Sequence, residues 1–150
     1  MDSTPELLLL IEKSPLLIGY NPMGDEPDPN DYFKEQNIGK GFGFMVSQDK
    51  DIDPIACAHT VREMNMSDAP LVFIPGREFD SRGTRHGRGG GWYDRFISSL
   101  PASWVRIGVA SAERVHDEFL KRNEWDEEMD FLLIHGEKWS VRKVGTHHTR

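Results

Sequence analysis

The residues best suited to chemistry lie between positions 75 and 95, in the sequence PGREFDSRGTRHGRGGGWYDR. An apolar run at residues 71–74 leads into this segment and a periodic stretch at residues 92–100 follows it, which predicts a strand, a glycine-rich loop and a helix. Backbone amide groups in such a loop can bind phosphate oxygens, and the N-terminus of the following helix favours negative charge. The segment therefore predicts an anion-binding site.

Glycines and arginines supply the binding groups of this segment. The glycines allow the backbone to approach a ligand, and the arginines add charged, forked donors that suit phosphate and carboxylate. They are Gly87, Gly89, Gly90 and Gly91, with Arg82, Arg85, Arg88 and Arg95. Asp94 lies at the predicted start of the helix, where its carboxylate could bind a metal ion that is also bound to the phosphates. The glycine pattern alone also fits a flexible loop with solvated arginines, so it is weak evidence by itself.

The charge of the chain is concentrated in the same place. The formal net charge is −7, but residues 77–95 carry five arginines against three carboxylates, a net charge of +2 that leaves −9 for the remainder. A basic island on an acidic protein indicates a local anion site. It argues against a broad nucleic-acid-binding face, which is typical of basic domains, so we expect no nucleic-acid partner.

Length and composition predict one globular domain over residues 1–150. Apolar residues make up 37% of the chain and charged residues 29%, so disorder is not expected. The single cysteine, Cys57, excludes an internal disulfide and fits a reducing compartment. No apolar run approaches the ~20 residues that span a bilayer. We therefore expect a cytoplasmic monomer with no membrane partner.

Strand and helix patterns alternate along the chain. The expected strands are residues 16–20, 41–46, 70–74, 105–110 and 131–134, and the expected helices are residues 6–12, 31–36, 54–64, 93–100 and 111–122. Residues 1–14 would contain a short N-terminal helix, and the tail at 136–150 would be frayed. The alternation predicts an α/β fold: a single three-layer α/β/α domain with a mostly parallel, Rossmann-like sheet. Ligands of such sheets gather at the carboxyl ends of the strands, where residues 21–26 and the glycine-rich loop would meet.

The whole segment is more informative than its glycines. It resembles the signature of the 5-formyltetrahydrofolate cyclo-ligase family, also called 5,10-methenyltetrahydrofolate synthetase. The residues that carry the resemblance are Pro75-Gly76, Phe79-Asp80, Gly83, Arg85, Gly87, Gly89, Gly90, Gly91 and Tyr93-Asp94-Arg95. The resemblance extends to residues 16–28, which look like the first strand of that family and its exit loop. It extends also to residues 123–133, which are similar to the closing segment of the family.

The resemblance implies an enzyme that converts 5-formyltetrahydrofolate to 5,10-methenyltetrahydrofolate, with ATP and Mg²⁺ as cofactors and release of ADP and phosphate. It implies Arg85 and Arg88 as catalytic residues, and Asp94 and Asp130 as ligands of Mg²⁺. The ATP phosphates would be bound by Arg85, Gly87, Arg88, Gly89, Gly90, Gly91, Trp92 and Tyr93. The folate would be bound by Met23, Glu26, Arg88 and Trp92.

The chain also departs from the family pattern. The family begins with a helix whose lysine and arginine reach ATP, whereas Lys13 is the only basic residue before Leu16 here. The stretch between Glu26 and Pro75 is shorter than in the family. These departures leave open a non-catalytic member of the family that binds a folate or a nucleotide. A remoter alternative is an RNA-binding arginine–glycine loop at residues 82–91, which the acidic remainder disfavours.

Overall fold

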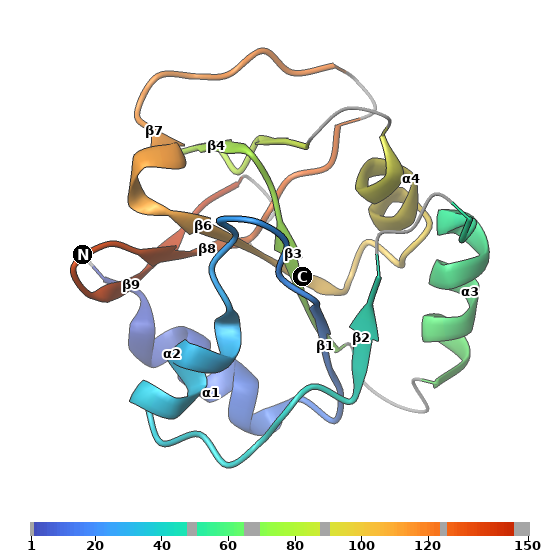
Figure 1. Ribbon diagram of the computed structural model, residues 1–150, viewed down its shortest axis with the longest axis horizontal. Helices are drawn as coiled ribbons and strands as arrows, with labels where there is room; N and C mark the ends of the chain where they lie inside the picture. Colours follow the sequence, from blue (N-terminus) through green and yellow to red (C-terminus); the bar gives the residue numbers. More distant parts are fainter. Residues whose placement is uncertain (1, 48–50, 65–69, 88–90, 124–125, 146–150) are drawn as a thin grey trace.

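A computed structural model describes residues 2–47, 51–64, 70–87, 91–123 and 126–145 (Figure 1). The helices in these ranges are α1 (Thr4–Lys13), α2 (Pro29–Glu35), α3 (Pro54–Met64), α4 (Trp92–Ser98) and a short 3₁₀ helix, η1 (Ala112–Arg114). The strands of the main sheet are β1 (Leu17–Tyr20), β2 (Phe44–Val46), β3 (Leu71–Pro75), β6 (Val105–Ser111), β8 (Phe131–His135) and β9 (Trp139–Lys143). A smaller sheet contains β4 (Glu78–Asp80), β5 (Arg85–His86) and β7 (Val115–His116).

The main sheet is mostly parallel, as the alternation of strands and helices predicted. Its strand order is β2-β1-β3-β6-β8-β9, and β9 alone runs antiparallel to its neighbour. The central strands are buried on both faces, which explains why β3 reads as an uninterrupted apolar run rather than an alternating one. The carboxyl ends of β1, β3, β6 and β8 therefore share one edge of the sheet.

Helices cover both faces of the sheet, so the predicted three layers are confirmed. Leu7 and Ile11 of α1 pack with Tyr32 and Phe33 of α2 in one apolar cluster. The cluster on the opposite face contains residues of α3 and α4 and the other side of the strands, among them Ala58, Val61, Trp92, Phe96 and Ile97. Figure 1 shows the two helix pairs on either side of the strands. Within the described ranges, no helix is both long and apolar enough to cross a lipid bilayer.

The predicted frayed tail is wrong for Trp139–Lys143, which form β9. Leu133 pairs with Val141 in the antiparallel ladder between β8 and β9. The N-terminal segment then fastens the outer side of β9: the Ser3 N–H donates to the Val141 carbonyl at 2.8 Å, and the Lys143 ammonium pairs with Glu6 at 2.9 Å. Pairing with β8 thus orders residues that were expected to be frayed.

The predicted helix at residues 111–122 is also wrong. Only Ala112–Arg114 form a helical turn, and Val115 and His116 then pair with Phe79 and Asp80 in the smaller sheet. Beyond that point the backbone of the segment is held by distant side chains: Leu120 N–H donates to Asp80 at 2.8 Å. Tertiary hydrogen bonds and strand pairing here override a local helix pattern.

Lys40 secures the C-terminus of α1 from a distant part of the chain. Its ammonium donates to the carbonyls of Ile11, Glu12 and Ser14 at 2.8, 2.6 and 2.9 Å. A cation at this position satisfies terminal carbonyls and favours the negative end of the helix dipole.

We therefore expect Lys40→Met to lower the free energy of unfolding by about 1–2 kcal/mol, because the carbonyls lose a charged donor while the apolar stem is kept. Urea denaturation measures the change. Lys34→Met, at an exposed position of α2, serves as the control and should change stability by less than half as much. Equal losses in the two variants would contradict the capping role.

Candidate active site

Arg85 lies at the centre of a polar cluster beside the carboxyl end of β3. The residue is 5% exposed, and its Nε donates to the Pro75 carbonyl at 2.6 Å. One terminal nitrogen lies 3.4 Å from a carboxylate oxygen of Asp94, and the guanidinium stands 5.1 Å from the centre of the Tyr93 ring. Burial lowers the pKa of Arg85, and the negative charges of Asp94 and Glu26 oppose that effect. The guanidinium thus lies against protein groups on several sides.

Two glycines of the predicted loop have a clear geometric role. A Cβ atom at Gly87 would lie 3.2 Å from both terminal nitrogens of Arg85, so glycine makes room for the guanidinium. Gly91 precedes α4 with φ +68°, a left-handed conformation that glycine adopts without strain. Arg88, Gly89 and Gly90, which carry much of the predicted phosphate binding, lie outside the described residues.

Glu26 reaches the same edge of the sheet from the loop after β1. One of its carboxylate oxygens accepts a hydrogen bond from the Met23 N–H at 2.9 Å, and its own N–H donates to the Met23 carbonyl at 3.1 Å. Burial raises the pKa of Tyr20, and the nearby charge of Glu26 raises it further. The same charge contributes to the raised pKa of Tyr93, whose main cause is burial. Glu26, Arg85 and Tyr93 are therefore electrostatic neighbours, while Met23 remains 48% exposed.

The prediction that Trp92 contacts the folate does not fit the structure. Its side chain is buried among core residues, with its ring stacked at 5.6 Å on Phe96. The indole N–H donates to the Ile52 carbonyl at 2.9 Å. Because α4 turns this side chain toward the core, Trp92 holds α4 in place and presents no free ring face to a ligand.

Asp130 does not join Asp94 as the prediction of a shared magnesium ion required. It precedes β8 and lies level with Arg106, whose N–H donates to its carboxylate at 2.9 Å. Through the register of β6 and β3 this position corresponds to Val72, three residues and about 10 Å before Pro75 along the strands. Among the residues that the structure describes, no group of three or more His, Cys, Asp or Glu side chains could hold a metal ion. Asp130 orders the amino end of the strands instead.

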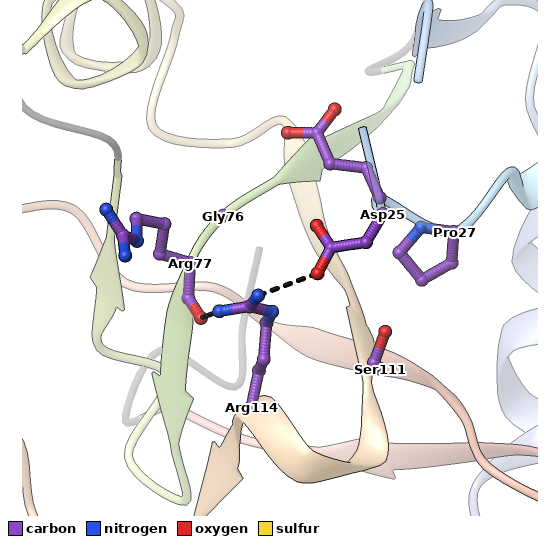
Figure 2. Close-up of a pocket in the computed structure, with 7 residues that line it drawn as sticks. Asp25, Pro27, Gly76, Arg77, Ser111 and Arg114 are labelled. Carbon is purple, nitrogen blue, oxygen red and sulfur yellow. Dashed lines mark hydrogen bonds and ion pairs between the residues drawn. The ribbon is translucent and has the colours of Figure 1, made fainter. Parts of the chain in front are cut away.

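A cavity of about 280 Å³ opens at the carboxyl edge of the sheet (Figure 2). Its walls come from the ends of β1, β3 and β6. The lining residues are Asp25, Glu26, Pro27, Gly76, Arg77, Ser111 and Arg114. A terminal nitrogen of Arg114 lies 2.7 Å from the Asp25 carboxylate, and this hydrogen bond raises the pKa of Arg114.

Sequence reasoning placed Glu26 at this edge but missed Arg77 and Arg114. The expected helix at residues 111–122 hid the position of Arg114. The informative signal was the position of Arg114 just past the carboxyl end of β6, where parallel strands present ligand-binding groups.

Comparison with known proteins identifies the family. The sequence profile of the 5-formyltetrahydrofolate cyclo-ligase family matches residues 39–135. The chain belongs to this family. The match includes the whole segment from Pro75 to Arg95, so the resemblance of that segment is confirmed. Met23 and Glu26 precede the matched residues.

Individual relatives of the cyclo-ligase family agree. The chain is 32% identical over 74 residues to 5-formyltetrahydrofolate cyclo-ligase of Mycoplasma genitalium, an alignment that covers 49% of this chain and 44% of the relative. It therefore spans less than half the length of that curated relative.

Two solved structures share the fold of this cyclo-ligase family member. The 5,10-methenyltetrahydrofolate synthetase of Aquifex aeolicus matches with a TM-score of 0.59 and 22% identity over 99% of this chain and 84% of that one. The corresponding synthetase of Mycoplasma pneumoniae matches with a TM-score of 0.50 and 24% identity over 88% and 80% of the two chains. At these identities the likeness establishes the α/β fold.

Proposed function

We propose that this chain catalyses the ATP-dependent conversion of 5-formyltetrahydrofolate to 5,10-methenyltetrahydrofolate. Family membership supports the reaction class. The observation that carries the proposal to this chain is that Glu26 and Gly76 line one cavity, and that Arg85, which pairs with Asp94, lies against Gly76. A site of this kind places an acidic group near the donor-rich edge of a pterin and cationic groups near anions. We also propose that the protein is cytoplasmic and monomeric.

The chemistry needs no protein nucleophile. The formyl oxygen attacks the γ-phosphoryl group and ADP leaves, which gives an imidate phosphate. N10 of the folate then attacks the activated carbon, N10 loses its proton and phosphate departs. The protein positions the two substrates and balances the charge of the phosphates, as in other phosphoryl transfers. In this scheme Glu26 orients the pterin, and the loop from Gly87 to Gly91 binds phosphates.

Arg85 has a different role from the predicted one. Its hydrogen bond to the Pro75 carbonyl and its contact with Asp94 commit it to protein groups, so we propose that it positions Asp94. Arg88 remains the proposed catalytic arginine. For magnesium, the carboxylate of Asp94 suits a hard ion and its side chain is 29% exposed. Asp94 would hold the ion together with phosphate oxygens, and the ion would neutralise phosphate charge.

A direct assay tests the proposal. Purified protein with 5-formyltetrahydrofolate and MgATP should form the methenyl product, followed by its near-ultraviolet absorbance. Asp94→Ala and Arg88→Ala should each lower kcat/KM at least about 100-fold, because both remove groups that act on phosphate charge in the transition state. Asp117→Ala, at a fully exposed side chain, is the matched control and should retain activity. An excess of chelator should abolish turnover.

A second candidate is a family member that binds folate without turnover. It is favoured by the commitment of Arg85 to protein groups. In that case calorimetry would detect 5-formyltetrahydrofolate binding while the assay detects no product with ATP. Product that depends on ATP and disappears in both variants would exclude this candidate.

A further inference from the structure

The Arg114–Asp25 ion pair lies among the residues that line the cavity and joins two distant parts of the chain (Figure 2). Asp25 comes from the loop after β1, and Arg114 ends η1, directly after β6. The second terminal nitrogen of Arg114 donates to the Arg77 carbonyl at 3.4 Å, which aims the guanidinium across the cavity. The pair therefore links the cavity wall after β1 to the cavity wall after β6.

This pair is suited to exchange rather than to stabilisation. The side chain of Asp25 is 60% exposed and that of Arg114 is 29% exposed. Water and salt screen exposed charges, so such pairs contribute little to folding and open at small cost. An arginine at a cavity wall can donate its N–H groups to another pair of anionic oxygens in place of the aspartate carboxylate.

The cavity has two chemically different ends. Glu26 lines it on the side of β1, where it offers carboxylate oxygens to a donor. Arg114 and Ser111 line it on the side of β6, where a guanidinium and a hydroxyl can donate. A ligand that carries donors at one end and an anion at the other is complementary to both.

We propose that Arg114 binds an anionic group of a ligand in this cavity. Until the ligand binds, Asp25 pairs with Arg114 as an exchangeable counter-ion, which the ligand anion then replaces. The shared chemistry is a pair of oxygens on a carboxylate or a phosphate. This inference rests on the proposed function for the identity of the ligand: with Glu26 at the pterin, the anion is a glutamyl carboxylate of the folate. A phosphate of the nucleotide is the other source, and the experiment separates them.

The first arm uses probes that do not react. N-(4-aminobenzoyl)glutamate, which carries the glutamyl carboxylates without the pterin, and inorganic phosphate are titrated separately by NMR. Wild-type protein should bind the first probe, Arg114→Gln should weaken binding about tenfold or more, and Asp25→Asn should tighten it several-fold because the internal competitor is neutralised. Arg142→Gln and Asp117→Asn, the partners of another exposed pair, are the matched controls.

The outcomes decide the proposal in both directions. Loss of phosphate binding in Arg114→Gln, with the carboxylate probe unaffected, supports the subsite and assigns it to the nucleotide. Absence of binding by both probes, an unchanged Arg114→Gln, or weaker binding in Asp25→Asn overturns it.

The second arm measures turnover and separates this inference from the proposed function. Arg114→Gln should raise KM for the anionic substrate with kcat nearly unchanged. No turnover in the wild type, with probe binding as expected, contradicts the proposed function alone. Normal turnover with an unchanged KM in Arg114→Gln contradicts this inference alone.

Discussion

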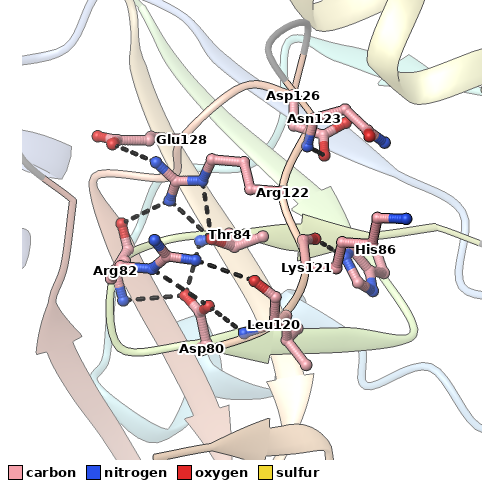
Figure 3. A network of polar contacts seen from close by, with 10 residues as sticks. All are labelled: Asp80, Arg82, Thr84, His86, Leu120, Lys121, Arg122, Asn123, Asp126 and Glu128. Carbon is pink, nitrogen blue, oxygen red and sulfur yellow. Dashed lines mark hydrogen bonds and ion pairs between the residues drawn. The ribbon is translucent and has the colours of Figure 1, made fainter. Parts of the chain in front are cut away.

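Replacing Asp80 by alanine is expected to lower the free energy of unfolding by about 3–5 kcal/mol, since a buried N–H left without an acceptor costs about 1–3 kcal/mol. The Asp80 carboxylate is fully buried and accepts hydrogen bonds from the N–H groups of Arg82, Thr84 and Leu120 at 2.9, 3.0 and 2.8 Å (Figure 3). Alanine supplies no acceptor to any of the three. The loss is therefore larger than that of one surface contact.

The expected effect is large because Asp80 joins two parts of the chain that are forty residues apart. Around it, Arg122 donates to the Thr84 hydroxyl at 2.6 Å and to Glu128 at 2.7 Å, and Arg82 donates to the Leu120 carbonyl at 2.9 Å. Together these contacts fix an irregular segment that has few backbone partners of its own. Without Asp80, we expect the segment from residue 117 to residue 123 to separate from β4.

Chemical denaturation with urea measures the loss, and two variants control it. Asp80→Asn keeps one acceptor oxygen and should lose clearly less stability than Asp80→Ala. Asp117→Ala removes a fully exposed carboxylate and should change stability by less than about 0.5 kcal/mol. An Asp80→Ala protein within 1 kcal/mol of the wild type, by the same measurement, would show that the three N–H groups find water instead.

The central strands of the sheet could be predicted from the sequence because they are largely apolar runs. Residues 71–74 and 105–110 have no other stable place than the middle of a parallel sheet with helices on both faces. The segment after Ser111 could not be predicted, because its structure depends on Asp80 and Phe79, more than thirty residues earlier. β9 likewise depends on β8 and α1 for its order.

The candidate site was predictable where position along a strand decided it. Glu26 follows the carboxyl end of β1 and lines the cavity there, whereas Arg85 lies in β5 and Asp94 in α4, where the two side chains approach within 3.4 Å. The sequence could not show which way a side chain on α4 turns, so Trp92 was assigned to the ligand although it is core. The expected strand at residues 131–134 already placed Asp130 before its strand, and the hydrogen bond from the Arg106 N–H to its carboxylate agrees with that position.

The second large effect concerns Arg85. Replacing it by methionine is expected to lower the free energy of unfolding by about 3 kcal/mol. This value is near the lower end of the range for breaking a buried ion pair, because the Asp94 carboxylate keeps some contact with water. Methionine has a similar length but cannot donate to Pro75 or balance Asp94. Turnover should fall by more than the loss of folded protein explains, since Asp94 loses its partner.

Three variants make this prediction specific. Arg85→Lys should recover little stability, because one ammonium cannot donate to Pro75 and Asp94 with the spacing of a guanidinium. Asp94→Asn combined with Arg85→Met completes a double-mutant cycle, in which the coupling energy should be about 1–2 kcal/mol. Arg142→Met, at a half-exposed side chain, is the control.

The pair of readouts separates the two possible roles of Arg85. A residue that positions Asp94 changes stability and kcat together, and its effect on kcat shrinks in an Asp94→Asn background. A residue that acts on the phosphates directly lowers kcat by the same factor in both backgrounds and leaves stability unchanged. Because the guanidinium is 5% exposed and already donates to Pro75 at 2.6 Å, we expect the first result.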